Sequence, residues 1–107
     1  MKIFYFKTSK FSAEAFYQDG RMTITKNSTA NSNILSSCPI AIKNIRQQLI
    51  ESGILKEAAG KLIFIDNYIC SSPSQASAII YGSSSNGMLS WKDINGKTLK
   101  WHLRQEE

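Results

Sequence analysis

Residues 71–82 read SSPSQASAIIYG and hold more signals for local structure than any other stretch of the chain. Ser72 suits the N-cap of a helix and Pro73 its first position, where the missing N–H of proline would be unpaired in any case. Gln75 stands where a capping-box side chain reaches back, and Gly82 suits a left-handed stop. The stretch therefore predicts a short helix with a defined start and end. Its buried face is expected to hold Ala76, Ile79 and Ile80.

The chain has 107 residues, of which 42% are hydrophobic and 20% charged, as in ordinary globular proteins. We therefore expect one domain over residues 1–107. No apolar run approaches the roughly 20 residues needed to cross a bilayer, and the start of the chain does not resemble a signal peptide. These features predict a cytoplasmic protein without a membrane partner. The formal charge of +5 leans toward a polyanionic partner.

Residues capable of catalysis or metal binding are sparse. Cys38 and Cys70 have no second ligand at metal-binding spacing, and the chain holds one histidine, so we expect no metal and no cofactor. His102 alternates out of phase with its apolar neighbours, which predicts that it faces solvent or a partner. The serines at 71, 72 and 74 are better explained by helix capping than by nucleophilic attack. We therefore expect no catalytic residues and no enzyme activity of its own.

The first part of the chain predicts three strands. The apolar run at residues 3–6 indicates a strand that is central or covered on both faces. Asp19-Gly20 is a strong hairpin signal between residues 11–18 and 21–26. A type I′ turn there pairs Gln18 with Arg21 and Ala15 with Ile24, which places the smaller apolar residues on one face.

The middle of the chain predicts a loop, a helix and a strand. Residues 27–37 are rich in Ser and Asn and indicate a mobile loop. Residues 39–52 indicate a helix with Ile42, Ile45 and Leu49 toward the core. A stripe beside that face is either a solvated flank or a phosphate-contacting one; it consists of Lys43, Arg46, Gln47 and Ile50. Residues 56–60 would link this helix to a covered strand at 62–65.

The tail predicts a second hairpin with a three-residue loop at 94–96. This register pairs Asp93 with Lys97 and Trp91 with Leu99, and it places Trp101 on the same apolar face as Trp91. Both tryptophans would then be core residues, whereas an exposed tryptophan would serve as a base-stacking platform. The whole order predicts an α+β fold with a largely antiparallel sheet, two hairpins, one longer helix and one short helix.

Several separated segments resemble one known family, the domain of unknown function four-three-five-seven. The resemblance is carried by Ser71-Ser72-Pro73-Ser74, Ala76, Ala78, Gly82, Asn86-Gly87, Trp91-Lys92, Gly96 and Leu99. Residues 22–28 resemble the family's strand and residues 46–55 its arginine-bearing helix, so the similarity covers about residues 11–100. Departures from the pattern are Asn27, Ser77 and Cys70.

That resemblance implies work associated with DNA. The family often lies carboxy-terminal to GIY-YIG endonuclease domains or stands alone in bacteria, and it is similar to a domain attached to restriction and adenine-methylation enzymes. No GIY-YIG sequence occurs in these 107 residues, so we expect any nuclease activity to belong to another protein.

The leading hypothesis is therefore a non-catalytic accessory module that binds nucleic acid. Arg46, Lys92 and Lys100 would contact phosphates, Ser72 and Ser74 would donate to an anion at the helix N-terminus, and Asn86 would contact a base or shape its turn. The alternative is a module that docks on a nuclease or another protein partner through exposed aromatic faces of the first strand or the last hairpin.

Overall fold

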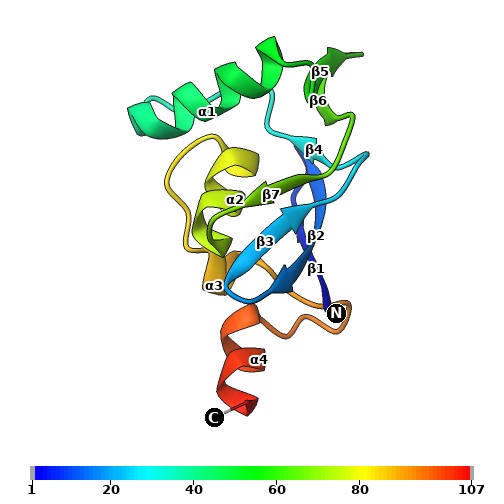
Figure 1. Cartoon of the computed structure of the whole chain (residues 1–107), viewed down its shortest axis with the longest axis vertical. Coiled ribbons are helices and arrows are strands. Elements are labelled where there is room, and N and C mark those ends of the chain that lie inside the picture. Colours follow the sequence, from blue (N-terminus) through cyan, green and yellow to red (C-terminus); the bar gives the residue numbers. More distant parts are fainter. Residues whose placement is uncertain (1, 107) are drawn as a thin grey trace.

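The computed structural model describes residues 2–106 as an α+β fold built on two antiparallel sheets (Figure 1). The larger sheet has the strand order β1 (Lys2–Lys7), β2 (Ser12–Gln18), β3 (Arg21–Ile24) and β7 (Tyr68–Cys70). The smaller sheet has the order β4 (Thr29–Ala30), β6 (Lys61–Phe64) and β5 (Leu55–Ala58). The helices are α1 (Ile40–Glu51), α2 (Pro73–Tyr81), α3 (Gly87–Ser90) and α4 (Leu99–Gln105). No helix within residues 2–106 is long and apolar enough to cross a membrane.

The first hairpin forms in the expected register. Gln18 pairs with Arg21 and Ala15 with Ile24, and both turn residues have positive φ, 52° at Asp19 and 81° at Gly20. These angles suit the mirror-image turn that matches the twist of the strands. β1 pairs with β2 on one side and, among residues 2–106, meets only Lys92 through an isolated bridge on the other, and its Ile3 is 39% exposed, so β1 is neither a central strand nor covered on both faces as expected.

Helix α2 covers one face of the larger sheet and closes the core. Its own buried residues Ala76, Ile79 and Ile80 are 0% exposed, as the sequence predicted. The sheet contributes alternate residues to the same cluster: Phe4, Ala13, Ala15, Met22, Ile24 and Cys70. Within residues 2–106, Figure 1 shows no helix over the opposite face of this sheet, which we call the open face.

The smaller sheet corrects two expectations for the middle of the chain. Residues 56–60 are not a plain link, because β5 and β6 form a hairpin around Ala59 and Gly60, both with positive φ. The segment at 27–37, expected to be a loop, contains β4, and Ser28 and Asn31 within it are buried. Helix α1 forms as predicted, with Ile42 and Leu49 buried.

The tail begins as predicted and then departs from the prediction. Asp93 N donates to Lys97 O at 2.8 Å, Leu99 N donates to Trp91 O at 2.9 Å, and Gly96 is left-handed. The expected hairpin ends there, because Thr98 caps a helix by accepting a hydrogen bond from Trp101 N at 3.1 Å. The same register would next pair Leu89 with Trp101, but these two residues lie in α3 and α4. Trp101 therefore leaves the apolar face that it was expected to share with Trp91.

Candidate nucleic-acid interface

The polar groups at the start of α2 are used within the protein. Ser72 Oγ accepts a hydrogen bond from Gln75 N at 3.1 Å, which is the expected N-cap. Gln75 Oε1 accepts from Ser71 N at 2.8 Å. Ser74 Oγ accepts from Gly87 N at 3.0 Å and so joins α2 to α3. Both serine hydroxyls that were expected to donate to an anion thus accept hydrogen bonds that stabilise local structure.

Trp91 also holds the start of α2 in place. Its side chain is 0% exposed, and its indole Nε1 donates to Pro73 O at 3.0 Å. Gly87 lies so close to α2 that a Cβ atom there would be 2.2 Å from the carbonyl carbon of Pro73. Asn86 is exposed, but its Oδ1 caps α3 by accepting from Met88 N at 3.0 Å. The stretch from Ser71 to Trp91 is thus a packed structural unit.

Arg46 is buried rather than placed on a surface flank of α1. It is 4% exposed, and its guanidinium donates to Ile79 O and, at 2.6 Å, to Asn31 O. Burial lowers the pKa of Arg46, and nearby Cys38 acts in the opposite direction. The side chain ties α1 to the end of α2 and to the segment after β4. It is therefore not available to a phosphate, contrary to the sequence expectation.

Helix α4 has two distinct sides. Leu99, His102, Leu103 and Glu106 follow helical spacing and line a hollow with Phe4, Tyr17 and Lys2 of the larger sheet. The positions that complement them carry exposed side chains. We call these positions, together with Lys97 just before the N-cap of the helix, the α4 stripe: Lys97, Lys100, Trp101 and Arg104. The stripe thus combines three cations with one large aromatic ring and includes no acidic residue.

Trp101 is the aromatic centre of the α4 stripe. It is 42% exposed, whereas Trp91 is fully buried. Lys97 Nζ lies 5.2 Å from the centre of the Trp101 ring, within the range of a cation–π contact. On its inner side the indole packs edge-on against His102, with 5.1 Å between ring centres. The ring is therefore held in place while a large part of it faces solvent.

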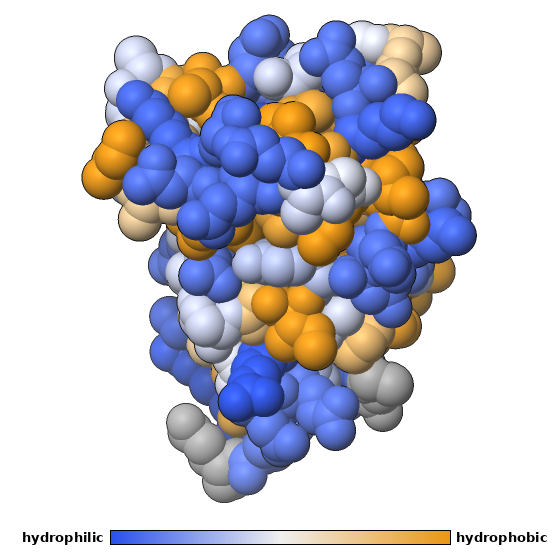
Figure 2. Space-filling model, turned by 45° about the horizontal axis from the view of Figure 1, so that its top comes forward, coloured by the Kyte–Doolittle hydropathy of each residue, from blue (hydrophilic) through white to orange (hydrophobic). Residues whose placement is uncertain are grey.

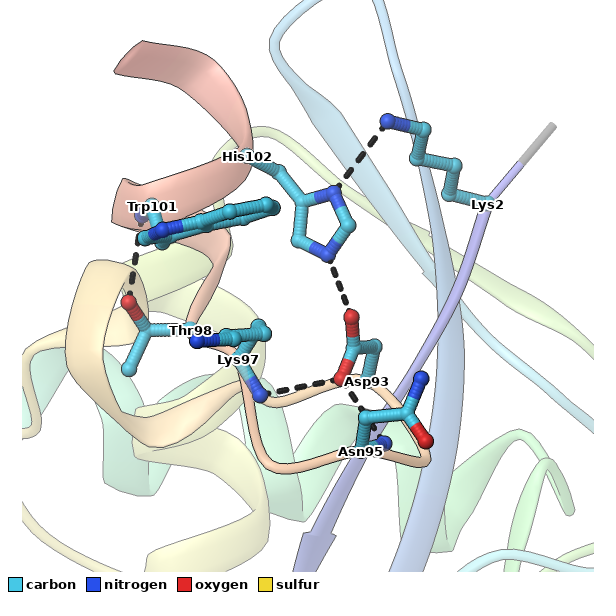
Figure 3. A network of polar contacts seen from close by, with 7 residues as sticks. All are labelled: Lys2, Asp93, Asn95, Lys97, Thr98, Trp101 and His102. Carbon is cyan, nitrogen blue, oxygen red and sulfur yellow. Dashed lines mark hydrogen bonds and ion pairs between the residues drawn. The ribbon is translucent and has the colours of Figure 1, made fainter. Parts of the chain in front are cut away.

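A polar network holds the α4 stripe against the rest of the molecule (Figure 3). His102 Nε2 lies 2.6 Å from Asp93 Oδ2, and its Nδ1 lies 3.1 Å from Lys2 Nζ. Asp93 Oδ1 also accepts hydrogen bonds from the backbone N–H groups of Asn95 and Lys97, at 2.9 Å each. The side chain of His102 is only 14% exposed, so the expectation that it faces solvent or a partner is wrong.

Lys92 and Lys100 come to the same end of the protein. Lys92 forms isolated antiparallel bridges with Tyr5 of β1 and with Thr98, the residue that caps α4. Lys100 lies in the first turn of that helix, and both lysines are exposed. Figure 1 places α4 at one end of the long axis, near the start of β1, and α1 at the other end. Of the predicted site residues, these two lie together at the end of the protein that carries α4.

Sequence reasoning missed Lys97 and Arg104 because it placed the tail in a strand. The signals for a helix were Thr98 as a possible N-cap and the four-residue spacing of Leu99 and Leu103. If the tail is interpreted as a helix, Lys97, Trp101 and Arg104 lie on one side of it. If it is interpreted as a strand, these side chains scatter over two faces.

Other parts of the surface are less suited to a polyanion. A hollow of about 520 Å³ lies between α1 and the β5–β6 hairpin, but its lining includes the acidic Glu57 as well as Lys43, and Arg46 at its wall already binds two carbonyls. In the view of Figure 2, apolar side chains reach the surface as patches among polar ones. No three His, Cys, Asp or Glu side chains among residues 2–106 gather as a metal site would require.

Comparisons with known proteins identify a family. No curated protein and no solved structure gives a significant match. A family model described as Domain of unknown function (DUF4357) matches residues 4–102. The match includes most of the first strand, which the resemblance found in the sequence had left out. Because this match covers nearly the whole chain, the protein belongs to the DUF4357 family.

Proposed function

We propose that this protein is a non-catalytic module that binds nucleic acid through the α4 stripe. The observation that carries the proposal is the grouping of Lys97, Lys100 and Arg104 around the exposed ring of Trp101. Lysine and arginine side chains that neutralise phosphates release counterions, and this release drives binding at low salt. Lys92, beside the cap of α4, extends the same basic end.

The charge of the tail supports this assignment. Glu106 and Glu107 follow the α4 stripe, but residues 92–104 themselves contain four basic side chains and one acidic one, out of 13 basic and eight acidic in the chain. The acidic residue is Asp93, whose carboxylate is turned toward His102 and the adjacent turn. Its negative charge is therefore already engaged, and the outward cations face solvent without an acidic partner in the stripe. Such a surface favours a polyanion over a neutral ligand.

The cellular role follows from the family resemblance and is part of the proposal. The module would act in the bacterial cytoplasm beside a nuclease or a restriction-type enzyme and bring that enzyme to its nucleic-acid substrate. The catalytic chemistry would then belong to that partner enzyme.

A titration of labelled oligonucleotides with the protein over a range of salt concentrations tests the proposal. We expect the affinity to fall linearly with salt on a double-logarithmic plot. The triple variant Lys97→Gln, Lys100→Gln, Arg104→Gln should reduce the steepness of that plot by about two to three on duplex DNA, close to one for each lost contact.

A control variant makes the result specific to the stripe. Lys10→Gln, Lys43→Gln, Lys56→Gln removes the same charge from exposed side chains elsewhere and should leave the slope nearly unchanged. Equal slopes for both triple variants would mean that only net charge matters. Absence of binding at low salt to DNA and RNA, single-stranded or duplex, would refute the proposal.

A second candidate function is docking on a protein through the open face. A cross-strand row runs over all four strands of the larger sheet there, because Ile3 pairs with Phe16, Phe16 with Thr23, and Thr23 with Ile69. Ile69 is 63% exposed and Ile3 39%. A partner that binds in stoichiometric amount, survives nuclease treatment and is lost on Ile69→Lys would favour docking over nucleic-acid binding.

A further inference from the structure

We infer that the polymer bound by the α4 stripe is single-stranded, with one base stacked on Trp101. The inference rests on the proposed function and names the class of nucleic acid. An indole that is 42% exposed adds little to the core of the protein, whereas Trp91 fills the core completely. What the exposed ring offers is a flat π surface beside cations, which is the combination found at sites for single strands.

The geometry around Trp101 suits a nucleotide better than a bare phosphate. The edge contact with His102 fixes one side of the indole, so the ring need not be ordered when a base arrives. Lys97 Nζ lies over one face of the ring, 5.2 Å from its centre, so a base would stack on the opposite face, with Lys97 close enough to contact its backbone phosphate. Lys100 and Arg104 precede and follow the ring along the same side of the helix. One base and its neighbouring phosphates thus meet complementary groups on one short helix and on Lys97 just before it.

Duplex nucleic acid cannot use this ring in the same way. Within a helix each base is covered above and below by its neighbours, so an indole reaches a free base face only where the strand is unpaired or flipped out. Duplex binding by the stripe would rest on the cations alone. A preference for single strands, carried by Trp101, is therefore the expected signature.

The chain provides its own reporter for this contact. Because Trp91 is buried and Trp101 exposed, stacking should quench the emission of Trp101 and leave that of Trp91 unchanged. Titrating the full chain with oligothymidylate at low salt should quench part of the tryptophan emission. The same titration of Trp101→Leu should show no quenching and an affinity at least about five-fold lower, while its affinity for duplex of equal length changes less than about two-fold.

A second measurement needs no variant. An abasic strand with the same number of phosphates keeps the charge and removes the bases, so we expect it to bind at least about five-fold more weakly than oligothymidylate. Comparing the affinities for oligouridylate and oligothymidylate shows whether the bound strand is RNA or DNA.

The outcomes separate the two proposals. Equal affinity for the abasic and thymidine strands, or unchanged quenching in Trp101→Leu, would overturn the stacking inference. Salt-dependent binding in the same experiment would still support the proposed function. Lack of binding to every polymer at low salt would overturn both.

Discussion

Asp93 Oδ2 lies 2.6 Å from His102 Nε2, although Asp93 precedes the turn at 94–96 and His102 lies in α4. The other carboxylate oxygen holds the turn at 94–96, and His102 reaches Lys2 of β1 on its far side. One carboxylate therefore joins the turn to α4, and His102 joins both to the larger sheet. The α4 stripe keeps its shape because of this inner network (Figure 3).

The first prediction concerns acid stability. The hydrogen bond from His102 lowers the pKa of Asp93, with the backbone N–H groups of Lys97 and Asn95 acting the same way and desolvation opposing them. A carboxyl group with a lower pKa in the folded state stabilises the fold at pH values above its unfolded pKa of about 3.9. That contribution is lost as the pH falls through the lower pKa of the folded protein. The unfolding free energies of wild type and Asp93→Asn should therefore differ at pH 7 and converge below about pH 4.

Urea unfolding followed by circular dichroism at several pH values measures this convergence. The wild type should be the more stable protein at neutral pH. If the difference between the two unfolding free energies stays constant down to pH 2, Asp93 is not the cause of this pH dependence.

The second prediction separates structure from binding at Arg46. Arg46→Met leaves two buried carbonyl oxygens, of Ile79 and Asn31, without their charged donor, which should cost about 1–3 kcal/mol of unfolding free energy. Lys43→Met, at an exposed position one turn earlier, should cost less than about 0.5 kcal/mol. The affinity of folded Arg46→Met for oligonucleotides should equal that of the wild type. If Arg46→Met has normal stability but binds oligonucleotides more weakly, Arg46 is part of the binding site.

The third prediction concerns the contact of α3 with α2. In Gly87→Ala the new Cβ would meet backbone atoms of Pro73 and Ser74 at 2.2–2.4 Å, and these atoms cannot move aside as a flexible side chain could. We expect a loss of about 1–3 kcal/mol or more. Thermal unfolding measures it, at roughly 4–8 °C for each kcal/mol in a domain of this size. Ser84→Ala, at an exposed position in the preceding loop, is the matched control, and an equal midpoint for both variants would contradict the close packing.

The fourth prediction concerns cysteine reactivity. Burial raises the pKa of the Cys70 thiol to about 12, and its side chain is 0% exposed. Because the thiolate is the reactive form, iodoacetamide at pH 8 should leave Cys70 unmodified in the native protein and label it rapidly in urea. Mass spectrometry of the labelled peptide reads the result. Rapid labelling under native conditions would show that the β7 region opens readily.

The parts of the fold that the sequence predicted carry their signals locally. Asp19 and Gly20 accept the positive φ of their turn, and this turn sets the register of β2 and β3. Ser72 begins α2 because its side chain accepts a hydrogen bond from Gln75 N, and Gly82 ends it in the left-handed conformation. Such features need only a few neighbouring residues, so a sequence shows them directly.

The parts that it missed depend on distant contacts. Helix periodicity placed Arg46 on the flank of α1, but only the folded chain brings Asn31 and Ile79 carbonyls to it. The β5–β6 turn uses Ala59 at a φ of 53°, a conformation that alanine rarely adopts, so Gly60 alone did not predict the hairpin. The tail fits a strand or a helix by its apolar spacing alone. Leu99 belongs to the same core cluster as Phe4, and Leu103 and Tyr17 pack against that cluster, which favours the helix.

The most direct test of the central claim is a map of amide chemical shifts in the full chain, titrated with oligothymidylate at low salt. We predict that the shifts concentrate at Lys97, Lys100, Trp101 and Arg104, with a smaller change at Lys92. The N-terminus of α2, including Ser72 and Ser74, and the exposed side of α1 should stay unchanged. Saturable shifts centred on those two regions, with α4 unaffected, would contradict the account.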